Sequence, residues 1–354
     1  MALRLTVTEE LPSDWESVTQ HAAAPATRRW IQLGHDWLPG RLHTLALRDD
    51  DGECLAAIGA AVVEDPGARL RLNAHQVLSG GTAAMGLAAE GPYPWADTEH
   101  DEVFPSLLLM YPNYASFPVG PASRDRAVLK EFVARITDWA RAQGLRSVSL
   151  LFLRASADPF IEELRSAGFD ILELTQTCDL RVTWTDLDGY FLSLPSKRRV
   201  EARRELRMLE ERGIELDARP LAAEEPEILD LRCQLAEKYD GVSDIERERR
   251  ILNGLREHVA PEDLTVFTAG KDGTMLGFGL MVRDGEEWTA AIAGTNYRRE
   301  ESEFTYFANL YYQPAALASA HGVKTIGYGP GSWDAKRRRG CELSPLYAAG
   351  LLLG

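Results

Sequence analysis

The sequence predicts an α/β (α+β) protein made of two related halves, each a mixed, mostly antiparallel sheet flanked by helices. One observation is a repeated hairpin pattern, in which two strand-like runs surround an Asp-Gly turn at Asp51 and again at Asp272. Another is a helix that ends in glycine before an apolar strand, at Gly144 and again at Gly322. The length of the chain also agrees with two halves, because 354 residues divide naturally into two domains of about 170.

The two copies differ in length. Their Asp-Gly turns are 221 residues apart, whereas the glycines at the helix ends are 178 apart. We therefore expect a first domain over residues 1–177 with an insertion near residues 64–103, and a second domain over residues 178–354. A mixed α/β protein without a repeat could contain the same turns, and this alternative remains open.

In the first half, apolar periodicity and turn residues predict the elements in order. Residues 79–91 are rich in glycine and alanine and suggest a loop or mobile helix, and a proline at 112 ends the strand before it. The expected helices are 12–23, 124–143 and 159–166, and the expected strands are 42–48, 54–64, 107–110, 147–153 and 170–175.

In the second half, Ser196 is expected to cap a helix that ends at Gly213. A long helix over residues 303–321 would contain Pro314. The other expected helices are 226–239 and 245–258, and the expected strands are 264–268, 275–283, 287–293 and 326–328.

Charge and composition limit the function. A net charge of −15 argues against nonspecific nucleic-acid binding over the whole surface, but cations gather in residues 196–212 and 336–339. The longest apolar run, residues 54–63, is about half a membrane span, so we expect a cytoplasmic chain without one. Neither the four scattered cysteines nor the seven histidines have metal-ligand spacing, which predicts no metal site.

The order strand, strand, strand, helix, strand is that of the GNAT acetyltransferase core. Its phosphate loop needs a glycine pair opening a helix, so that backbone amides hold pyrophosphate. Here residues 295–303 (TNYRREESE) contain no glycine, and Glu300, Glu301 and Glu303 would repel phosphate.

The chain resembles the Fem-type aminoacyltransferases of the peptidoglycan and antibiotic-biosynthesis branch. Residues 304–347 contain the aromatic helix, the glycine-rich strand end at 327–331 and the basic Lys-x-x-x-Gly turn, and Ser196-Lys197-Arg198-Arg199 resembles the start of the second domain. The long helical arm of the cell-wall members has no counterpart, since no sustained apolar heptads occur. The resemblance therefore implies two tandem GNAT-like domains and a small-molecule acceptor.

The resemblance implies amide formation by attack of an amine on an aminoacyl-tRNA ester, with no cofactor beyond this co-substrate. Positioning and oxyanion stabilisation dominate such chemistry. Lys336 is expected to contact phosphate or the oxyanion, and side chains near the start of the helix 303–321 are expected to relay a proton. The catalytic candidates are Lys336, Glu303, Tyr306 and Tyr311. The candidates for binding the tRNA acceptor end are Lys197, Arg198, Arg203, Arg207, Tyr328, Trp333, Lys336 and Arg339.

Two alternatives remain open. The chain could be an acyl-CoA-dependent N-acetyltransferase whose phosphate loop has degenerated, or a noncatalytic double-GNAT binding protein. Each candidate residue also has a structural interpretation, as a solvated helix face, an exposed basic turn or a core aromatic. The amino acid, the acceptor and the oligomeric state are not defined by the sequence.

Overall fold

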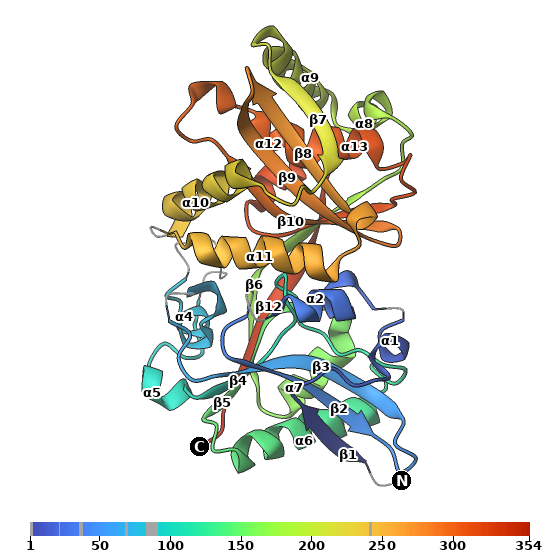
Figure 1. The fold of residues 1–354 in the computed structure, drawn as a ribbon. Helices are drawn as coiled ribbons and strands as arrows, with labels where there is room; N and C mark the ends of the chain where they lie inside the picture. Colours follow the sequence, from blue (N-terminus) through green and yellow to red (C-terminus); the bar gives the residue numbers. More distant parts are fainter. Residues whose placement is uncertain (1–2, 21, 35–37, 68–69, 83–90, 241–242) are drawn as a thin grey trace. The chain divides into compact units, whose positions relative to one another are not determined.

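A computed structural model describes residues 3–20, 22–34, 38–67, 70–82, 91–240 and 243–354 (Figure 1). The chain divides into two compact units, unit 1 comprising Met1–Thr177 with Ser344–Gly354 and unit 2 comprising Cys178–Leu343. The sequence placed residues 344–354 in the second domain, which is wrong. These residues form most of strand β12 (Glu342–Leu352), which pairs antiparallel with β5 (Ser147–Arg154) of unit 1.

Unit 1 contains a mixed sheet in which β4 and β5 are parallel and the other consecutive pairs from β1 to β4 are antiparallel. The hydrogen-bonded order is β1-β2-β3-β4-β5-β12-β6. Most strands alternate between the two cores of the unit, so both faces of the sheet are covered. The further strands are β1 (Arg4–Thr8), β2 (Arg41–Arg48), β3 (Cys54–Val63), β4 (Ser106–Leu109) and β6 (Asp170–Arg181).

Unit 2 repeats this topology, which confirms the predicted internal repeat. Its strands follow the order β7-β8-β9-β10-β11, with β10 and β11 parallel and the preceding pairs antiparallel. Strand β6 enters unit 2 at Cys178 and lies next to β11. The strands are β7 (Glu215–Pro220), β8 (Leu264–Lys271), β9 (Thr274–Asp284), β10 (Glu287–Thr295) and β11 (Thr325–Pro330).

Both predicted hairpins are present. In the second, Asp272 and Gly273 have φ of 52° and 74°, as a type I′ turn requires, and Lys271 pairs directly with Thr274. In the first, the Asp49 side chain accepts hydrogen bonds from two later backbone amides of a longer loop. The segment between β3 and β4, where the sequence analysis places an insertion, lies outside the repeated strands.

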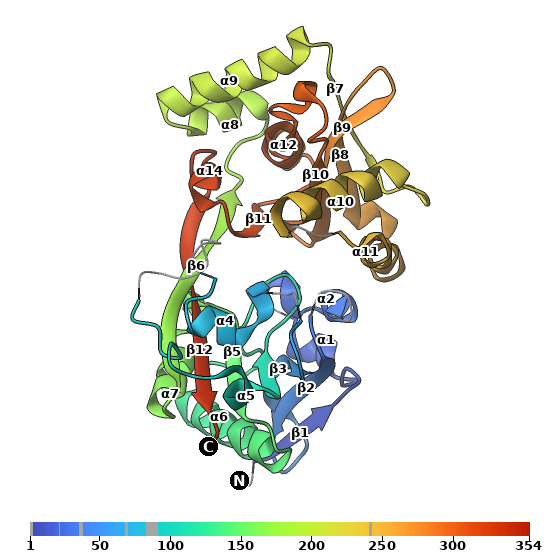
Figure 2. The same ribbon diagram turned by 90° about the vertical axis from the view of Figure 1, so that its left-hand side faces the viewer.

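The helices of unit 1 lie on both faces of its sheet, and Figure 2 shows α6 and α7 together at one side. The predicted helix 12–23 is wrong: α1 is one turn, and the chain then forms the short 3-10 helix η1 around Pro25. Most of the predicted loop 79–91 lies outside the described residues. The helices are α1 (Trp15–Val18), η1 (Ala24–Ala26), α2 (Arg28–Gln32), η2 (Leu70–Leu72), α4 (Ala74–Leu78), α5 (His100–Val103), α6 (Arg126–Ala142), η4 (Ala155–Ala157) and α7 (Asp158–Ser166).

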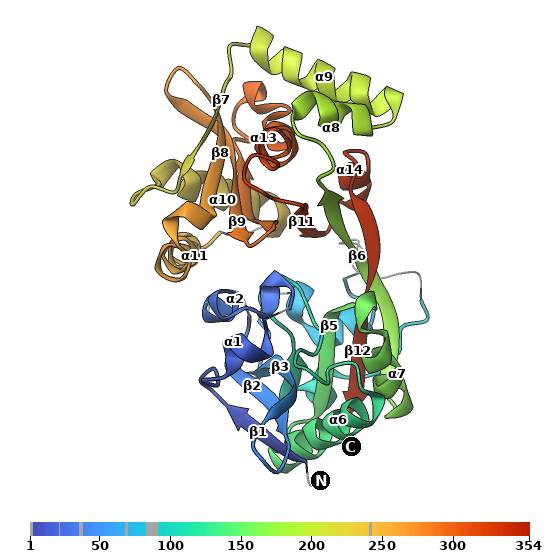
Figure 3. The same ribbon diagram turned by 90° about the vertical axis from the view of Figure 1, so that its right-hand side faces the viewer.

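In unit 2, α8 and α9 pack together, and α10 and α11 form a second pair against β10 (Figure 3). Ser196 is the first residue of α9 and not its cap, because Pro195 occupies the cap position and no side chain caps the helix. The helices are α8 (Leu187–Ser193), α9 (Ser196–Glu211), α10 (Pro226–Asp240), α11 (Ile245–His258), η5 (Pro261–Asp263), η6 (Glu300–Ser302), α12 (Thr305–Phe307), η7 (Ala308–Tyr312), α13 (Gln313–Leu317) and α14 (Trp333–Arg337).

The predicted long helix 303–321 is divided into α12, a π-helical turn (η7) and α13. Pro314 lies at the start of α13, where its missing N–H is accommodated by the wide preceding turn. Two glycines of β9 permit this turn to approach closely, because a Cβ atom on Gly279 would lie 2.9 Å from the Asn309 carbonyl oxygen. Such π turns occur often at functional sites. No helix within the described residues is long and apolar enough to cross a membrane.

Candidate functional site

The site residues predicted near the C-terminal end of unit 2 lie on three elements: β11, the short helix α14 and the π-helical turn η7. Lys336, on α14, is only 5% exposed. Its Nζ donates to the carbonyl oxygens of Tyr328, Gly329 and Pro330 at 2.7, 3.0 and 3.0 Å. The lysine therefore ties α14 to the end of β11 and holds a positive charge there.

Positive backbone φ angles make this arrangement possible. Gly329, Gly331 and Ser332 have φ of 62°, 81° and 47°, and they turn the chain so that successive carbonyl groups face one point. The alternative interpretation of Lys336 and Arg339 as an exposed basic turn is therefore wrong. They occupy positions i and i+3 of one helical turn and face inward, whereas the two arginines between them pair with Asp334 at the surface.

Arg339 is 8% exposed and forms the centre of a second set of contacts. Its Nη2 donates to both carboxylate oxygens of Glu205, at 3.1 and 3.0 Å. Its guanidinium carbon lies 3.3 Å from the centre of the Phe307 ring. The charge is thus balanced by a carboxylate on one side and an aromatic face on the other.

Three buried tyrosines lie beside these residues. The hydroxyl of Tyr312 donates to Glu205, and that of Tyr328 donates to the Leu310 carbonyl oxygen at 2.6 Å. The ring of Tyr328 packs against Tyr311, with centres 4.5 Å apart. Burial raises the pKa of all three phenols, so they are neutral hydrogen-bond donors near neutral pH.

Glu205, Tyr312 and Tyr190 were missed by the sequence analysis. Tyr190 of α8 donates to the Arg339 carbonyl oxygen at 2.9 Å. A signal existed for Glu205, because it lies at helical spacing between the buried residues Ala202 and Leu209, where a carboxylate must find a partner. We use the name arginine cluster for Glu205, Phe307, Tyr312 and Arg339.

The remaining catalytic candidates lie outside the arginine cluster. Glu303 is exposed and pairs with Arg212 at 2.8 Å, beside an open hollow of about 830 Å³ that Glu300 and Glu301 also line. Tyr306 is half-buried, and its ring centre lies 5.7 Å from that of Phe307. The structure thus brings together Lys336, Tyr311, Tyr328 and Arg339, with Tyr306 near them and Glu303 elsewhere.

The cations predicted to bind tRNA along α9 differ in their partners. Arg198, Arg203 and Arg207 pair with Glu201, Asp188 and Glu211. Among the described residues, Lys197 has no ion-pair partner, and neither has Arg204 on the same helix. Trp333 is 40% exposed, and the guanidinium of Arg337 lies 5.7 Å from its ring. Exposed cations and an exposed ring suit contact with nucleic acid.

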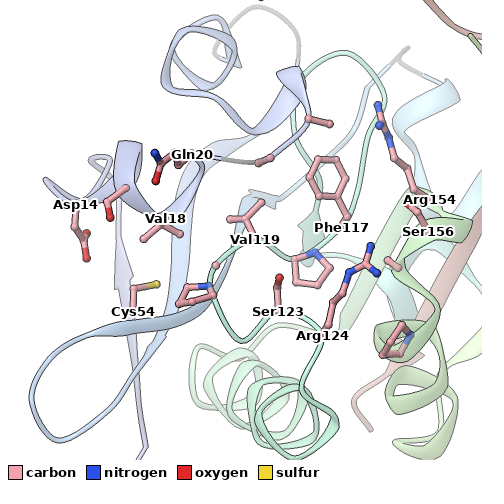
Figure 4. A pocket seen from close by; sticks show the side chains of 18 of the residues that line it. Asp14, Val18, Gln20, Cys54, Phe117, Val119, Ser123, Arg124, Arg154 and Ser156 are labelled. Carbon is pink, nitrogen blue, oxygen red and sulfur yellow. The ribbon is translucent and has the colours of Figure 1, made fainter. Parts of the chain in front are cut away.

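The structure also contains a cavity of about 640 Å³ in unit 1 (Figure 4). None of the predicted site residues line it. Over the described part of the chain, no group of histidine, cysteine and acidic side chains could hold a metal ion, and all four cysteines are free thiols.

Comparison with known proteins defines the family. A family model named FemAB-like, with the description peptidoglycan biosynthesis/recognition, matches residues 102–352. No match was found among curated proteins.

Solved structures show the same fold at low identity. The structure of FemX is 12% identical, with a TM-score of 0.63, over 99% of this chain and 97% of that one. A tandem GNAT protein from the clavulanic acid biosynthesis pathway is 11% identical, with a TM-score of 0.56, over 100% and 99%. The C-terminal domain of a putative lysylphosphatidylglycerol synthetase from Agrobacterium fabrum is 14% identical, with a TM-score of 0.53, over 94% and 89%.

The family match covers more than two thirds of the chain, and the two repeated units agree with the tandem GNAT fold of the similar structures. The chain therefore belongs to the FemAB-like family and is an acyltransferase of the Fem and GNAT type.

Proposed function

We propose that the protein transfers an aminoacyl group from aminoacyl-tRNA to an amine of a small molecule and forms an amide. Membership of the FemAB-like family and the likeness to FemX support an aminoacyl-tRNA donor, which is the donor of Fem-type enzymes. In this proposal the protein works in the cytoplasm, where aminoacyl-tRNA is made. It needs no cofactor beyond the donor.

The observation that carries the choice of donor is the charge at the two helix starts where a GNAT enzyme would hold the diphosphate of CoA. In unit 2, Glu300, Glu301 and Glu303 precede α12, whose cap residue Phe304 provides no side-chain hydrogen bond. In unit 1, the Asp125 carboxylate accepts from the first amides of α6. Carboxylates at both positions oppose a diphosphate but do not affect an ester on tRNA.

The chemistry of this transfer can be written with the residues of unit 2. The acceptor nitrogen attacks the ester carbonyl carbon, the C–O bond to the terminal ribose breaks, and the proton lost by the nitrogen passes to the departing ribose oxygen. Lys336 would stabilise the oxyanion through its charge alone, because its three N–H groups already donate to the carbonyl oxygens at the end of β11. Arg339 contributes less charge to this step, because Glu205 balances it. Burial raises the pKa of Tyr311 and Tyr328, so these two phenols would act as hydrogen-bond donors rather than as bases.

A small acceptor is favoured over a peptidoglycan precursor by the size of the helices. The longest helix of the described residues, α6, has 17 residues, which is too short for the long helical arm of the cell-wall members. The likeness to the tandem GNAT protein of clavulanic acid biosynthesis points in the same direction.

Calorimetric titration with acetyl-CoA tests the donor. We expect no binding tighter than a Kd of about 100 μM, a free energy of roughly 5.5 kcal/mol. The matching positive test mixes the protein with tRNA charged with radiolabelled amino acids and with a panel of diamines and amino acids, and follows label in the small-molecule fraction. A micromolar Kd for acetyl-CoA, together with acetylation of the same amines, would replace this proposal by the acyl-CoA alternative.

A further inference from the structure

One carboxylate joins the two elements of unit 2 that carry Lys336 and Tyr311. Glu205 lies on α9, and both of its carboxylate oxygens accept from Nη2 of Arg339, at 3.1 and 3.0 Å. One of these oxygens also accepts from the hydroxyl of Tyr312. Arg339 follows α14, which contains Lys336, and Tyr312 is the last residue of η7, which contains Tyr311. The carboxylate therefore connects both elements to α9.

Two other carboxylates of α9 have different partners. Glu201 and Glu211 pair with arginines of the same helix, three and four residues away. The partners of Glu205 follow it by 107 and 134 residues. Its side chain is only 15% exposed, whereas those of Glu201 and Glu211 are 43% and 66% exposed. A largely buried carboxylate that accepts several hydrogen bonds is held in one place, and it holds its partners in turn.

Arg339 links this carboxylate to Lys336. Its backbone N–H donates to the Lys336 carbonyl oxygen at 2.9 Å, and its Nη1 donates to the Ala335 carbonyl oxygen at 3.2 Å. The ring of Phe307 covers one face of the same guanidinium at 3.3 Å. Because Glu205 fixes the guanidinium, and the guanidinium binds back to α14, the position of the Lys336 ammonium at the end of β11 depends on Glu205.

Tyr312 links the same carboxylate to the π-helical turn. Its hydroxyl holds the end of η7 against α9, and the hydroxyl of Tyr328 holds the Leu310 carbonyl oxygen of this turn against β11 at 2.6 Å. Tyr311 lies between these two attachments and is 1% exposed. Its hydroxyl forms no hydrogen bond with any residue that the structure describes, so the hydrogen of this group is available to a ligand.

We propose that Glu205 is a positioning residue for acyl transfer, which sets the Lys336 ammonium and the Tyr311 hydroxyl relative to each other without touching the substrate. This role rests on the proposed function, because it affects turnover only if those two groups act on the reacting ester. Displacement of a positioned group by about 1 Å can lower a rate by roughly a hundredfold. The length of the Glu205 side chain is therefore as important as its charge.

Glu205→Asp tests the proposal, because aspartate keeps the counter-ion of Arg339 but withdraws the carboxylate by one bond, about 1.5 Å. The variant should fold, yet its carboxylate cannot reach Arg339 and Tyr312 in the wild-type arrangement. With the charged tRNA and the amine that give transfer in the wild type, we expect kcat to fall at least about tenfold, with KM for the amine unchanged within about twofold. A residue that provided only stability or only charge would leave kcat unchanged.

Two further variants separate positioning from lost stability. Leu255→Ala removes a fully buried side chain of α11, outside the arginine cluster, so it should destabilise unit 2 and leave kcat unchanged. Tyr312→Phe removes one hydrogen bond of Glu205 and leaves the ion pair with Arg339 intact, so we expect a smaller fall in kcat, of about threefold.

A second measurement does not depend on transfer. Brief acylation of the folded full chain with acetic anhydride, followed by mass spectrometry, reports how well Lys336 is protected. Lys324, whose side chain is 70% exposed, is the internal reference. We expect Glu205→Asp to raise the acylation of Lys336 at least about threefold relative to the wild type and to Leu255→Ala, because a loosened α14 exposes a residue that is 5% exposed in the wild type.

A fall in kcat at constant KM, together with faster acylation of Lys336, supports the proposal. It is overturned if Glu205→Asp transfers at the wild-type rate, or if its Lys336 is acylated no faster than that of Leu255→Ala. If the wild type transfers from no charged tRNA, the proposed function fails, and the acylation of Lys336 alone decides whether Glu205 positions it.

Discussion

Replacing Glu205 by glutamine should destabilise unit 2 strongly, because it leaves the Arg339 charge buried without a counter-ion. The two side chains of this pair are 15% and 9% exposed, and the atoms that join them are 3.0 and 3.1 Å apart. Breaking a buried ion pair by removing one partner costs about 3 to 5 kcal/mol. The glutamine oxygen can still accept a hydrogen bond and the Phe307 face still attracts the cation, so we expect about 3 kcal/mol.

The measurement is urea unfolding at neutral pH, with Glu211→Gln as the control. Glu211 lies on the same helix and pairs with Arg207, but both side chains are 66% exposed. An exposed pair of this kind contributes less than about 1 kcal/mol. If Glu205→Gln lowers the free energy of unfolding no more than Glu211→Gln does, the ring and the backbone alone satisfy Arg339, and the reasoning about this pair is refuted.

Three further predictions concern Lys336, Asp14 and the surface of α9. Lys336→Met should lower the free energy of unfolding, measured with urea, by about 3 kcal/mol and abolish transfer, because three charge-assisted hydrogen bonds are lost. The control Lys324→Met, which removes one partner of an exposed ion pair, should change the free energy of unfolding by less than about 0.5 kcal/mol. Hydrogen bonds from Arg48 hold the pKa of Asp14 below its ordinary value of 3.8. The Asp14 carboxylate therefore stabilises the fold above pH 3.8, and this stabilisation is lost as the pH falls through the folded-state pKa. The difference in the free energy of unfolding between wild type and Asp14→Asn, measured with urea, should shrink on acidification, and a constant difference would contradict this assignment. Replacing Lys197 and Arg204 by alanine should lower the salt slope of tRNA binding in filter assays by roughly 2, and an unchanged slope would remove α9 from the tRNA surface.

The hairpins were predictable because their signal is local. Asp272 and Gly273 form a two-residue turn between two strand-like runs, and these two strands, β8 and β9, pair directly. Strand β12 was not predicted, because its partner Ser147–Arg154 is far away in the sequence and its own run contains proline and glycine. Pairing over such a distance leaves no local pattern.

The sequence did not indicate the environment of the candidate residues. The run of four cations at residues 336–339 resembles a solvated surface, and two of its members are in fact buried. Helical spacing would have distinguished the two buried cations from the two exposed ones between them, since positions i and i+3 lie on the same face of a helix. The carboxylate that balances Arg339 comes from Glu205, on an earlier helix, and only the folded chain brings the two together.

The placement of residues 344–354 in unit 1 has a consequence for the order of folding. All of unit 2 is synthesised before the strand that unit 1 requires beside β5. Until that strand arrives, β5 presents unpaired backbone amide and carbonyl groups, which is the kind of edge that recruits strands from other molecules. Unit 1 therefore cannot complete its sheet until residues 344–352 are available, and its β5 edge is open to aggregation in the meantime.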